Sequence, residues 1–136
     1  MAHRYLLDTN TFIYIRRRRP PHVLARFDRL NIGEAAMSVV SCGELMFGIE
    51  KRPLPAQGFA TLGEISALIP VLPLPASAAP IYGTIRATLE TRGQTIGPND
   101  LWIAAHAKAL DLTLVTNNER EFQRIDGLKI ENWMNV

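Results

Sequence analysis

Short apolar runs alternate with longer helical segments along the chain, and this alternation is the strongest constraint on its fold. The runs predicted to be strands are 5–7, 36–40, 71–74, 112–116 and 128–130. Helices are predicted over 11–15, 22–30, 41–50, 59–68, 76–92, 98–110 and 119–125. Strands that alternate with helices form parallel βαβ units, whose right-handed crossovers place helices on both faces of the sheet. We therefore expect an α/β fold, a three-layer α/β/α sandwich with a mostly parallel sheet of about five strands.

The composition is that of one globular domain, which we take to be residues 1–136. With 47% hydrophobic and 21% charged residues, the 136-residue chain can bury a core without disulfides. A single cysteine excludes an internal disulfide and a cysteine-based zinc cluster. We find no membrane-spanning stretch and no signal peptide before the first strand, so we expect a cytoplasmic protein. The net charge of +2 permits a nucleic-acid partner without requiring one.

The first predicted strand ends on an acid, Asp8. Parallel α/β sheets present their functional residues at the carboxyl ends of the strands. Asp8 is followed by Thr9 and Asn10, and this arrangement of oxygen atoms suits a hard cation. Alternatively, Asp8 or Asn10 caps the helix that follows. For Asp8 alone, the two interpretations are equally good.

Further polar residues fall at the other strand-to-helix junctions. Glu44 is expected in the first turn of the helix after the second strand, and Asp100 in the first turn of the helix opened by Pro98. Asn118 follows the fourth strand, with Glu121 one turn later. In a parallel fold all these junctions lie at one edge of the sheet. The topology therefore predicts that these side chains converge near Asp8.

Two of these acids also have ordinary structural interpretations. The segment Ser41–Glu44 matches a capping box, in which the glutamate bonds to the first backbone amide. Asp100 could complement the helix dipole, but it shares a face with Ile103, Ala104 and Ala107. A carboxylate that heads an apolar stripe needs a cation or strong donors. A bound metal ion is the simplest partner.

The ligand types select magnesium or manganese. Carboxylates without cysteine or paired histidines favour these ions over zinc. His106 lies six residues after Asp100, on a different helix face, and we expect it to be solvated or hydrogen-bonded. Carboxylate-held magnesium suits the hydrolysis of phosphate esters. The sequence has no P-loop, G-x-G-x-x-G or G-x-S-x-G motif, which argues against nucleotide-binding and serine-hydrolase functions.

Four short motifs stand in order at these junctions. They are Leu7-Asp8-Thr9-Asn10, Ser41-x-x-Glu44-Leu45-x-x-Gly48, Gly97-Pro98-Asn99-Asp100-x-x-Ile103-Ala104-Ala105 and Leu114-Val115-Thr116-Asn117-Asn118-x-x-Glu121-Phe122. Together they resemble the PIN-domain ribonucleases, and more narrowly the VapC-type toxins of bacterial toxin–antitoxin pairs. The resemblance covers essentially the whole chain. It implies a PIN fold and a Mg²⁺- or Mn²⁺-dependent endoribonuclease.

The resemblance also implies roles for individual residues. The family often has a fourth acid after the fourth strand, where this chain has Asn118, and this departure leaves the number of metal ions open. Glu121 is the candidate to compensate for it, and Thr116 resembles the family's small hydroxyl residue. The candidate catalytic residues are Asp8, Glu44, Asp100 and Asn118, of which the three acids are the metal ligands, supported by Thr116, Asn10 and Glu121.

Substrate and partners follow from the same resemblance. Such toxins cleave structured RNA, and we expect a transfer RNA as substrate, with the anticodon loop of initiator tRNA as the cleavage site. We also expect a homodimer, a small VapB-type antitoxin and a larger toxin–antitoxin hetero-oligomer.

Charged and apolar surfaces have two interpretations each. Candidate RNA contacts are Arg16, Arg17, Arg18, Arg19 and Arg86, although a solvated helix end explains the first four equally well. Residues 59–68 with Met46 and Phe47 form either an antitoxin groove or part of the core, and core packing is favoured for most of them.

Two other functions remain open. With Asn118 in place of an acid, the chain could bind RNA or antitoxin without cutting. A phosphoryl-accepting receiver-like domain also has acids at the rim, but it needs paired acids at the end of the first strand and a lysine near the end of the last strand. Thr9 follows Asp8, and no lysine lies at 116–118. We rank this function last.

Overall fold

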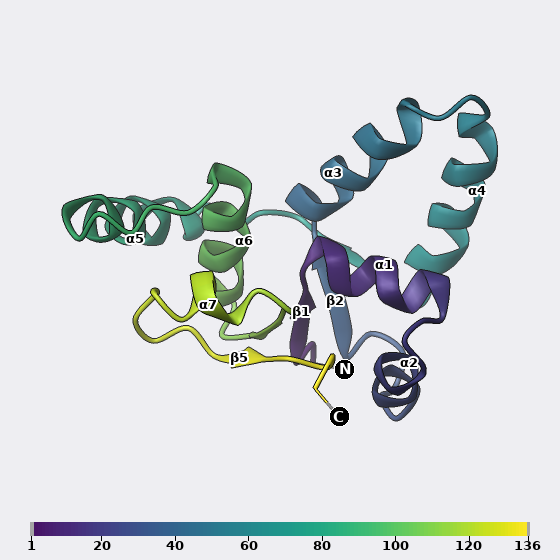
Figure 1. The fold of residues 1–136 in the computed structure, drawn as a ribbon, viewed down its shortest axis with the longest axis horizontal. Helices are drawn as coiled ribbons and strands as arrows, with labels where there is room; N and C mark the ends of the chain where they lie inside the picture. The colour runs from purple at the N-terminus through teal and green to yellow at the C-terminus, as the bar shows by residue number, and fades with distance from the viewer. Residues whose placement is uncertain (1, 136) are drawn as a thin grey trace.

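A five-stranded, entirely parallel sheet forms the centre of the computed structural model, which describes residues 2–135 (Figure 1). The strands are β1 (Tyr5–Leu7), β2 (Ala35–Ser38), β3 (Val71–Leu72), β4 (Thr113–Val115) and β5 (Ile130–Glu131). Their spatial order is β3-β2-β1-β4-β5, and all four pairings are parallel. The predicted parallel sheet is therefore confirmed.

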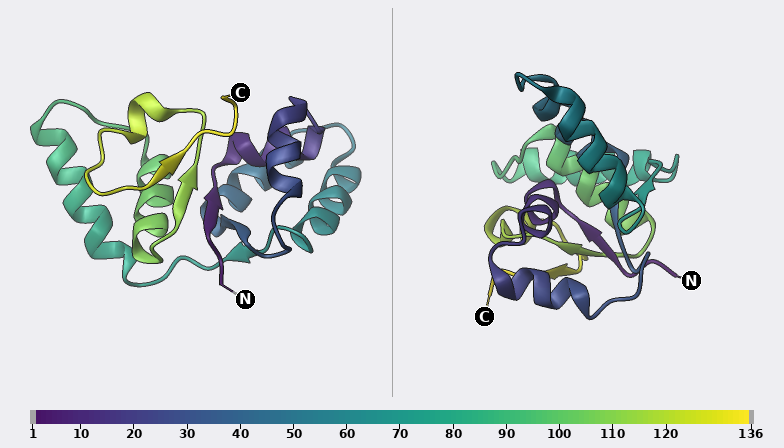
Figure 2. Two further views of the ribbon diagram at one scale, coloured as in Figure 1. Left: turned by 90° about the horizontal axis from the view of Figure 1, so that it is seen from below. Right: turned by 90° about the vertical axis from the view of Figure 1, so that its right-hand side faces the viewer.

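Helices cover both faces of the sheet, as predicted. One face carries α1 (Thr9–Arg17), α2 (Pro21–Asp28), α3 (Val39–Glu50) and α4 (Pro55–Ser66). The other carries α5 (Ala78–Thr91), α6 (Pro98–Ala109) and α7 (Glu119–Phe122). Figure 2 shows the two groups of helices on opposite sides of the strands. Within residues 2–135, none of the helices has the length and apolar character that crossing a membrane requires.

The alternation of side chains along β1 divides the core into two layers. Tyr5 and Leu7 pack among α1, α2, α3 and α4, whereas Leu6 packs among α5, α6 and α7. All three side chains are buried. A strand with both faces covered must be apolar throughout, which explains why the run before Asp8 has no polar residue.

The junction between β2 and α3 differs from the prediction. β2 ends at Ser38, and Val39 and Val40 belong to α3. The helix starts early because the Ser38 side chain caps it by accepting a hydrogen bond from the Val40 N–H. The capping box at Ser41 is therefore wrong, because Ser41 lies inside the helix. Glu44 consequently lies in the second turn of α3 and not in the first.

Other boundaries shift by a few residues. α1 begins at Thr9 because Asp8 caps it, and α4 begins at Pro55, where a proline suits the first turn. α7 ends at Phe122, earlier than predicted, and β5 begins at Ile130, later than predicted. β3 is an edge strand, as its flanking prolines indicated.

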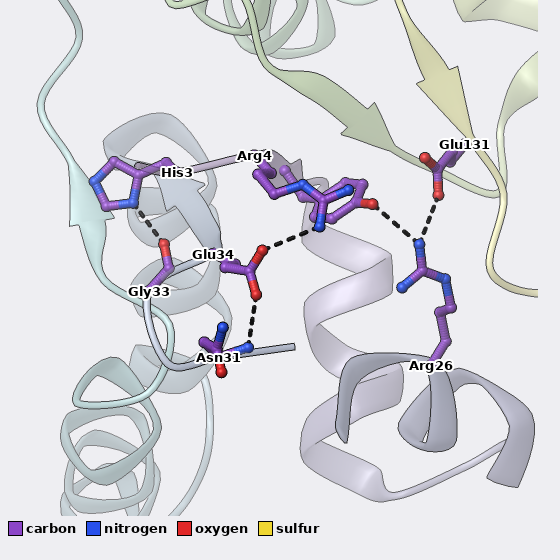
Figure 3. Close-up of polar contacts among 8 residues, drawn as sticks. His3, Arg4, Arg26, Asn31, Gly33, Glu34 and Glu131 are labelled. Atoms are coloured by element: carbon purple, nitrogen blue, oxygen red, sulfur yellow. Dashed lines mark hydrogen bonds and ion pairs between the residues drawn. The ribbon is translucent and has the colours of Figure 1, made fainter. Parts of the chain in front are cut away.

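Polar contacts around β1 attach its neighbours to the sheet (Figure 3). The Arg4 guanidinium pairs with Glu34, which precedes β2, at 3.1 Å. Arg26 on α2 lies 3.0 Å from the Tyr5 hydroxyl and 3.3 Å from Glu131 Oε1 on β5. These contacts are partly exposed and contribute little stability individually. They fix α2 and the C-terminal segment to the sheet.

Candidate active site

The candidate site lies where the strand order reverses. Leu7 of β1 pairs with Met37 of β2 on one side and with Val115 of β4 on the other. The chain leaves β1 toward β2 and reaches β4 only after crossing back from the edge strand β3. Such a reversal opens a crevice at the carboxyl ends of the two central strands. Asp8 and Thr116, the residues that follow Leu7 and Val115, meet in it.

Asp8 has both of the roles considered for it. Its Oδ1 accepts a 2.8 Å hydrogen bond from the Thr11 N–H, which caps α1. Its Oδ2 accepts a 2.6 Å hydrogen bond from the Thr116 hydroxyl. Burial raises the pKa of Asp8, the hydrogen bonds from Thr116 and Thr11 oppose this rise, and the charge of Glu44 adds to it. Asp8 is thus a fixed, buried carboxylate beside a second acid.

The carboxylate of Asp100 has no hydrogen-bond or ion-pair partner among the described side chains. It lies in the first turn of α6, half-buried above the fully buried Ala104. Burial, and after it the charges of Glu44, Glu121 and Asp8, raise the pKa of Asp100 to about 6. Within residues 2–135, no side chain donates a hydrogen bond to this carboxylate and none forms an ion pair with it. Asp100 therefore faces three other acids without a partner.

Two more carboxylates are oriented by neighbouring side chains. The Thr9 hydroxyl donates a 2.7 Å hydrogen bond to Glu44 Oε1. The Asn118 amide donates a 2.9 Å hydrogen bond to Glu121 Oε2, and the Asn118 N–H donates to the Thr116 hydroxyl at 2.9 Å. Asn118 stands where the family often has a fourth acid, and in this structure its side chain orients the neighbouring acid Glu121.

The four acids share one rim but do not form a closed set of ligands. Among the described residues, no three His, Cys, Asp or Glu side chains stand close enough together to hold an ion. Carboxylates at this spacing repel one another, and a divalent cation would offset the repulsion. Glu44 and Glu121 are hydrogen-bonded to Thr9 and Asn118 instead. The partnerless Asp100 and the all-oxygen donor set fit Mg²⁺ or Mn²⁺.

Several predicted residues lie outside this rim. Asn10 is exposed and makes no side-chain hydrogen bond to another described residue. The run Arg16–Arg19 lies at the far end of α1, about 12 Å along the helix from Thr9. Arg86 lies on the exposed face of α5, bonded to Glu90 at 3.1 Å and to the Tyr82 hydroxyl at 2.9 Å.

The sequence motifs did not reveal the roles of three other residues, Thr9, Arg52 and His106. Thr9 follows Asp8 in the sequence, but its bond to Glu44 depends on how α1 and α3 pack. Arg52, just after α3, repels the charge of Arg16: burial, and then the charges of Arg52 and Arg17, lower the pKa of Arg16. His106 is fully buried and not solvated, and its Nδ1 lies 2.8 Å from the Ser38 hydroxyl.

An open groove runs from the rim along α3. Its volume is about 630 Å³, and its lining includes Val39, Gly43, Glu44, Phe47 and Asn99. Phe47 is 65% exposed, and the neighbouring Met46 is 43% exposed. Met46 and Phe47 are therefore not part of the core, whereas Leu62 of α4 is buried, in agreement with the core packing favoured for most of this set.

Comparison with known proteins identifies the family of this chain and the branch of that family to which it belongs. The PIN domain family matches residues 5–128. Ribonuclease VapC2 of Haemophilus influenzae is 40% identical over 131 residues, which cover 96% of this chain and 98% of the relative. The tRNA(fMet)-specific endonuclease VapC of Shigella flexneri is 41% identical over 130 residues, with coverage of 96% and 98%.

Solved structures give the same result. The structure of DNA-bound VapBC from Salmonella typhimurium superposes with a TM-score of 0.89 at 39% identity, covering 97% of this chain and 99% of that one. VapBC2 from Rickettsia felis, bound to a DNA fragment from its promoter, gives a TM-score of 0.86 at 34% identity, covering 95% and 98%. The chain belongs to the PIN-domain family, in its VapC branch.

Proposed function

We propose that this protein is a Mg²⁺- or Mn²⁺-dependent endoribonuclease and the toxin of a VapBC-type toxin–antitoxin pair. The observation that carries the proposal is the carboxylate of Asp100, which is half-buried and without a partner beside Glu44, Glu121 and Asp8. An arrangement with this electrostatic cost is explained by a divalent cation that offsets it. The relatives named as ribonucleases and endonucleases support the reaction class.

The chain's own residues would perform three tasks at this rim. Asp8 and Asp100 hold the ion, and Glu44 completes the site either as a ligand or by orienting the attacking water. Thr116 keeps Asp8 in place, and Asn118 keeps Glu121 near Asp100. A bound divalent ion supplies the Lewis-acid chemistry of phosphodiester hydrolysis.

We propose transfer RNA as the substrate, and initiator tRNA in particular. The relative from Shigella flexneri is a tRNA(fMet)-specific endonuclease and matches almost the whole chain. A single-stranded loop needs cationic groups for its backbone. Arg16, Arg17 and Arg52 form a group of like charges at the far end of α1 that can supply them. Arg86 is a weaker candidate, because Glu90 already neutralises it.

We propose a VapB-type antitoxin as the protein partner. The exposed Phe47 lines the groove that leads to Glu44, so a partner segment lying there would cover an apolar surface and the rim together. The exposed Met46 precedes Phe47 on α3. The solved relatives are VapBC complexes. A homodimer of the toxin within a larger hetero-oligomer, in the cytoplasm, agrees with this assignment.

The test compares Asp8→Asn with Asp28→Asn, a matched change at an exposed acid in the last turn of α2. Asparagine is a good N-cap, so Asp8→Asn should leave α1 and the fold intact while it removes the ligand charge. We expect Asp8→Asn to abolish cleavage of initiator tRNA and Asp28→Asn to leave it unchanged. EDTA should stop the parent, and added Mg²⁺ or Mn²⁺ should restore it. Cleavage by Asp8→Asn, or cleavage insensitive to EDTA, would contradict the proposal.

The alternative is a module that binds RNA or antitoxin without cutting. Calorimetric titration of the antitoxin-free protein with Mn²⁺ separates the two functions. Binding that disappears in Asp8→Asn supports the nuclease, whereas absence of binding by the parent supports the inert module.

A further inference from the structure

One buried histidine connects the two helices that carry Glu44 and Asp100. His106 lies on α6 with no exposed surface, and its Nδ1 is 2.8 Å from the hydroxyl of Ser38. Ser38 is also fully buried, ends β2 and caps α3. The bond therefore joins the body of α6 to the capping residue of α3.

The protons on the two side chains follow from their partners. Ser38 Oγ accepts a 3.1 Å hydrogen bond from the Val40 N–H, so the hydroxyl proton is available for Nδ1 of His106. Burial lowers the pKa of His106, which keeps the imidazole neutral at pH 7. In this tautomer Nδ1 accepts and Nε2 carries the proton.

This polar contact is costly for the stability of the fold. The hydroxyl of Ser41, one turn beyond Ser38, is buried without a hydrogen-bond partner among the described residues. Nε2 of His106 also lacks a hydrogen bond of good geometry there, and only the Pro73 backbone lies close enough to oppose the effect of burial on the pKa of His106. Unpaired buried polar atoms destabilise a core that apolar side chains of similar size would fill. A hydrogen-bonded pair of this kind favours one relative orientation of the two helices, whereas apolar contacts are not directional.

The bond between His106 and Ser38 lies equally far along the two helices from Glu44 and from Asp100. Glu44 is six residues after Ser38 on α3, and Asp100 is six residues before His106 on α6, so each carboxylate lies about 9 Å along its helix from the bond. α3 and α6 also pack against each other. Sliding or rotation of one helix against the other at this contact would change the separation of the two acids.

We infer that His106 is a positioning residue: its bond to Ser38 fixes α3 against α6 so that Glu44 and Asp100 can hold one divalent ion. The inference rests on the proposed function, since it concerns the spacing of the proposed ligands. His106 itself touches neither acid in the structure. A residue that only filled the core would affect folding without a selective effect on the ion.

The test compares three substitutions on α6 and measures Mn²⁺ binding by calorimetry. His106→Asn keeps a polar atom near the place of Nδ1, whereas His106→Gln carries its amide one atom further out. Ile103→Val is the matched control, because it weakens the buried face of the same helix without touching Ser38. Thermal unfolding in EDTA shows that each variant is folded and gives its loss of stability.

We expect His106→Gln to weaken Mn²⁺ binding by about tenfold or more, as supporting residues behind metal ligands commonly do. His106→Asn should stay within about threefold of the parent, and Ile103→Val should bind as the parent does. Ser38→Ala should add no further loss in the His106→Gln background, because both changes remove the same bond.

Two results would overturn the inference. One is parent-like Mn²⁺ binding by folded His106→Gln. The other is a loss of Mn²⁺ affinity that is proportional to the loss of stability, with the same proportion in Ile103→Val and His106→Gln. If His106→Gln does not fold, His106→Asn decides: binding more than tenfold weaker than the parent rejects the assignment, and binding near the parent supports it. Absence of Mn²⁺ binding by the parent itself would refute the proposed function as well, and is distinct from either result.

Discussion

The Thr116 hydroxyl donates a 2.6 Å hydrogen bond to Oδ2 of Asp8, and this contact joins the ends of β4 and β1 across the crevice. The same hydroxyl oxygen accepts a 2.9 Å hydrogen bond from the Asn118 N–H. Thr116 thus orders both the buried acid and the residue that orients Glu121. A single side chain links two parts of the rim that come from opposite ends of the chain.

Thr116→Val should therefore damage the site without opening a cavity. Valine has the shape of threonine, but it leaves Asp8 Oδ2 and the Asn118 N–H without partners. We expect a loss of about 1–3 kcal/mol in the free energy of unfolding, because Asp8 is buried. Mn²⁺ affinity should fall as well. Denaturant unfolding in EDTA and calorimetry measure the two effects, and Thr116→Ser, which keeps the hydroxyl, is the control.

The stability of the metal-free protein should depend on pH through Asp100. The pKa of this acid is about 6 in the folded chain, against an ordinary value of 3.8. The folded state therefore binds more protons than the unfolded state between these values, and the free energy of unfolding should fall as the pH rises from 4 to 6. Allowing for partial exposure, we expect a loss of about 1–2 kcal/mol.

Asp100→Asn tests this linkage. The variant should show a smaller loss than the parent between pH 4 and 6, with only the part that comes from the raised pKa of Asp8 remaining, and it should be more stable than the parent at pH 7 in EDTA. Saturating Mn²⁺ should reverse the slope for the parent, since the ion binds the ionised carboxylate. Urea unfolding across this pH range measures both, and equal slopes in the parent and Asp100→Asn would show that Asp100 is not responsible.

The rim could be predicted from the sequence because it depends only on topology. Asp8 directly follows a strand, Asp100 lies in the first turn of its helix and Glu44 in the second turn of its own. The parallel topology brings such positions to one edge whatever the side-chain details. The bond between Thr9 and Glu44 could not be predicted in this way. It depends on the packing of α1 against α3, which residue spacing within either helix does not determine.

The start of α3 shows a second limit of sequence reasoning. Ser38 and Ser41 are both good caps, and Glu44 completes a capping box only with Ser41. The register of β2 decides between them, because Ser38 lies at the end of the strand beside Leu72 of β3. Val39 and Val40 suit a strand by propensity, but here the tertiary structure overrides that preference.

Asn118→Asp should make the metal-free site less stable and more responsive to ions. The change replaces the amide that donates to Glu121 with another negative charge. We expect a loss of about 1 kcal/mol in EDTA, because a hydrogen bond is removed and repulsion is added. The rise in Tm on adding Mn²⁺ should exceed that of the parent. Asn117→Asp adds the same charge at the exposed neighbour, so a comparable effect there would rule out a specific role for Asn118.

The arginines at the end of α1 should contribute to RNA affinity by neutralising phosphates. Arg16 and Arg17 have no ion-pair partner among the described residues, so their charges are available, whereas Arg86 is paired with Glu90. Arg16→Gln with Arg17→Gln should weaken tRNA binding and reduce the slope of log affinity against log salt by about 0.7 for each phosphate that the protein no longer neutralises. Binding is measured in EDTA with catalytically inactive Asp8→Asn protein at several salt concentrations. Arg86→Gln is the control, and a slope reduced equally by that change, or unchanged by the double substitution, would place the RNA backbone elsewhere.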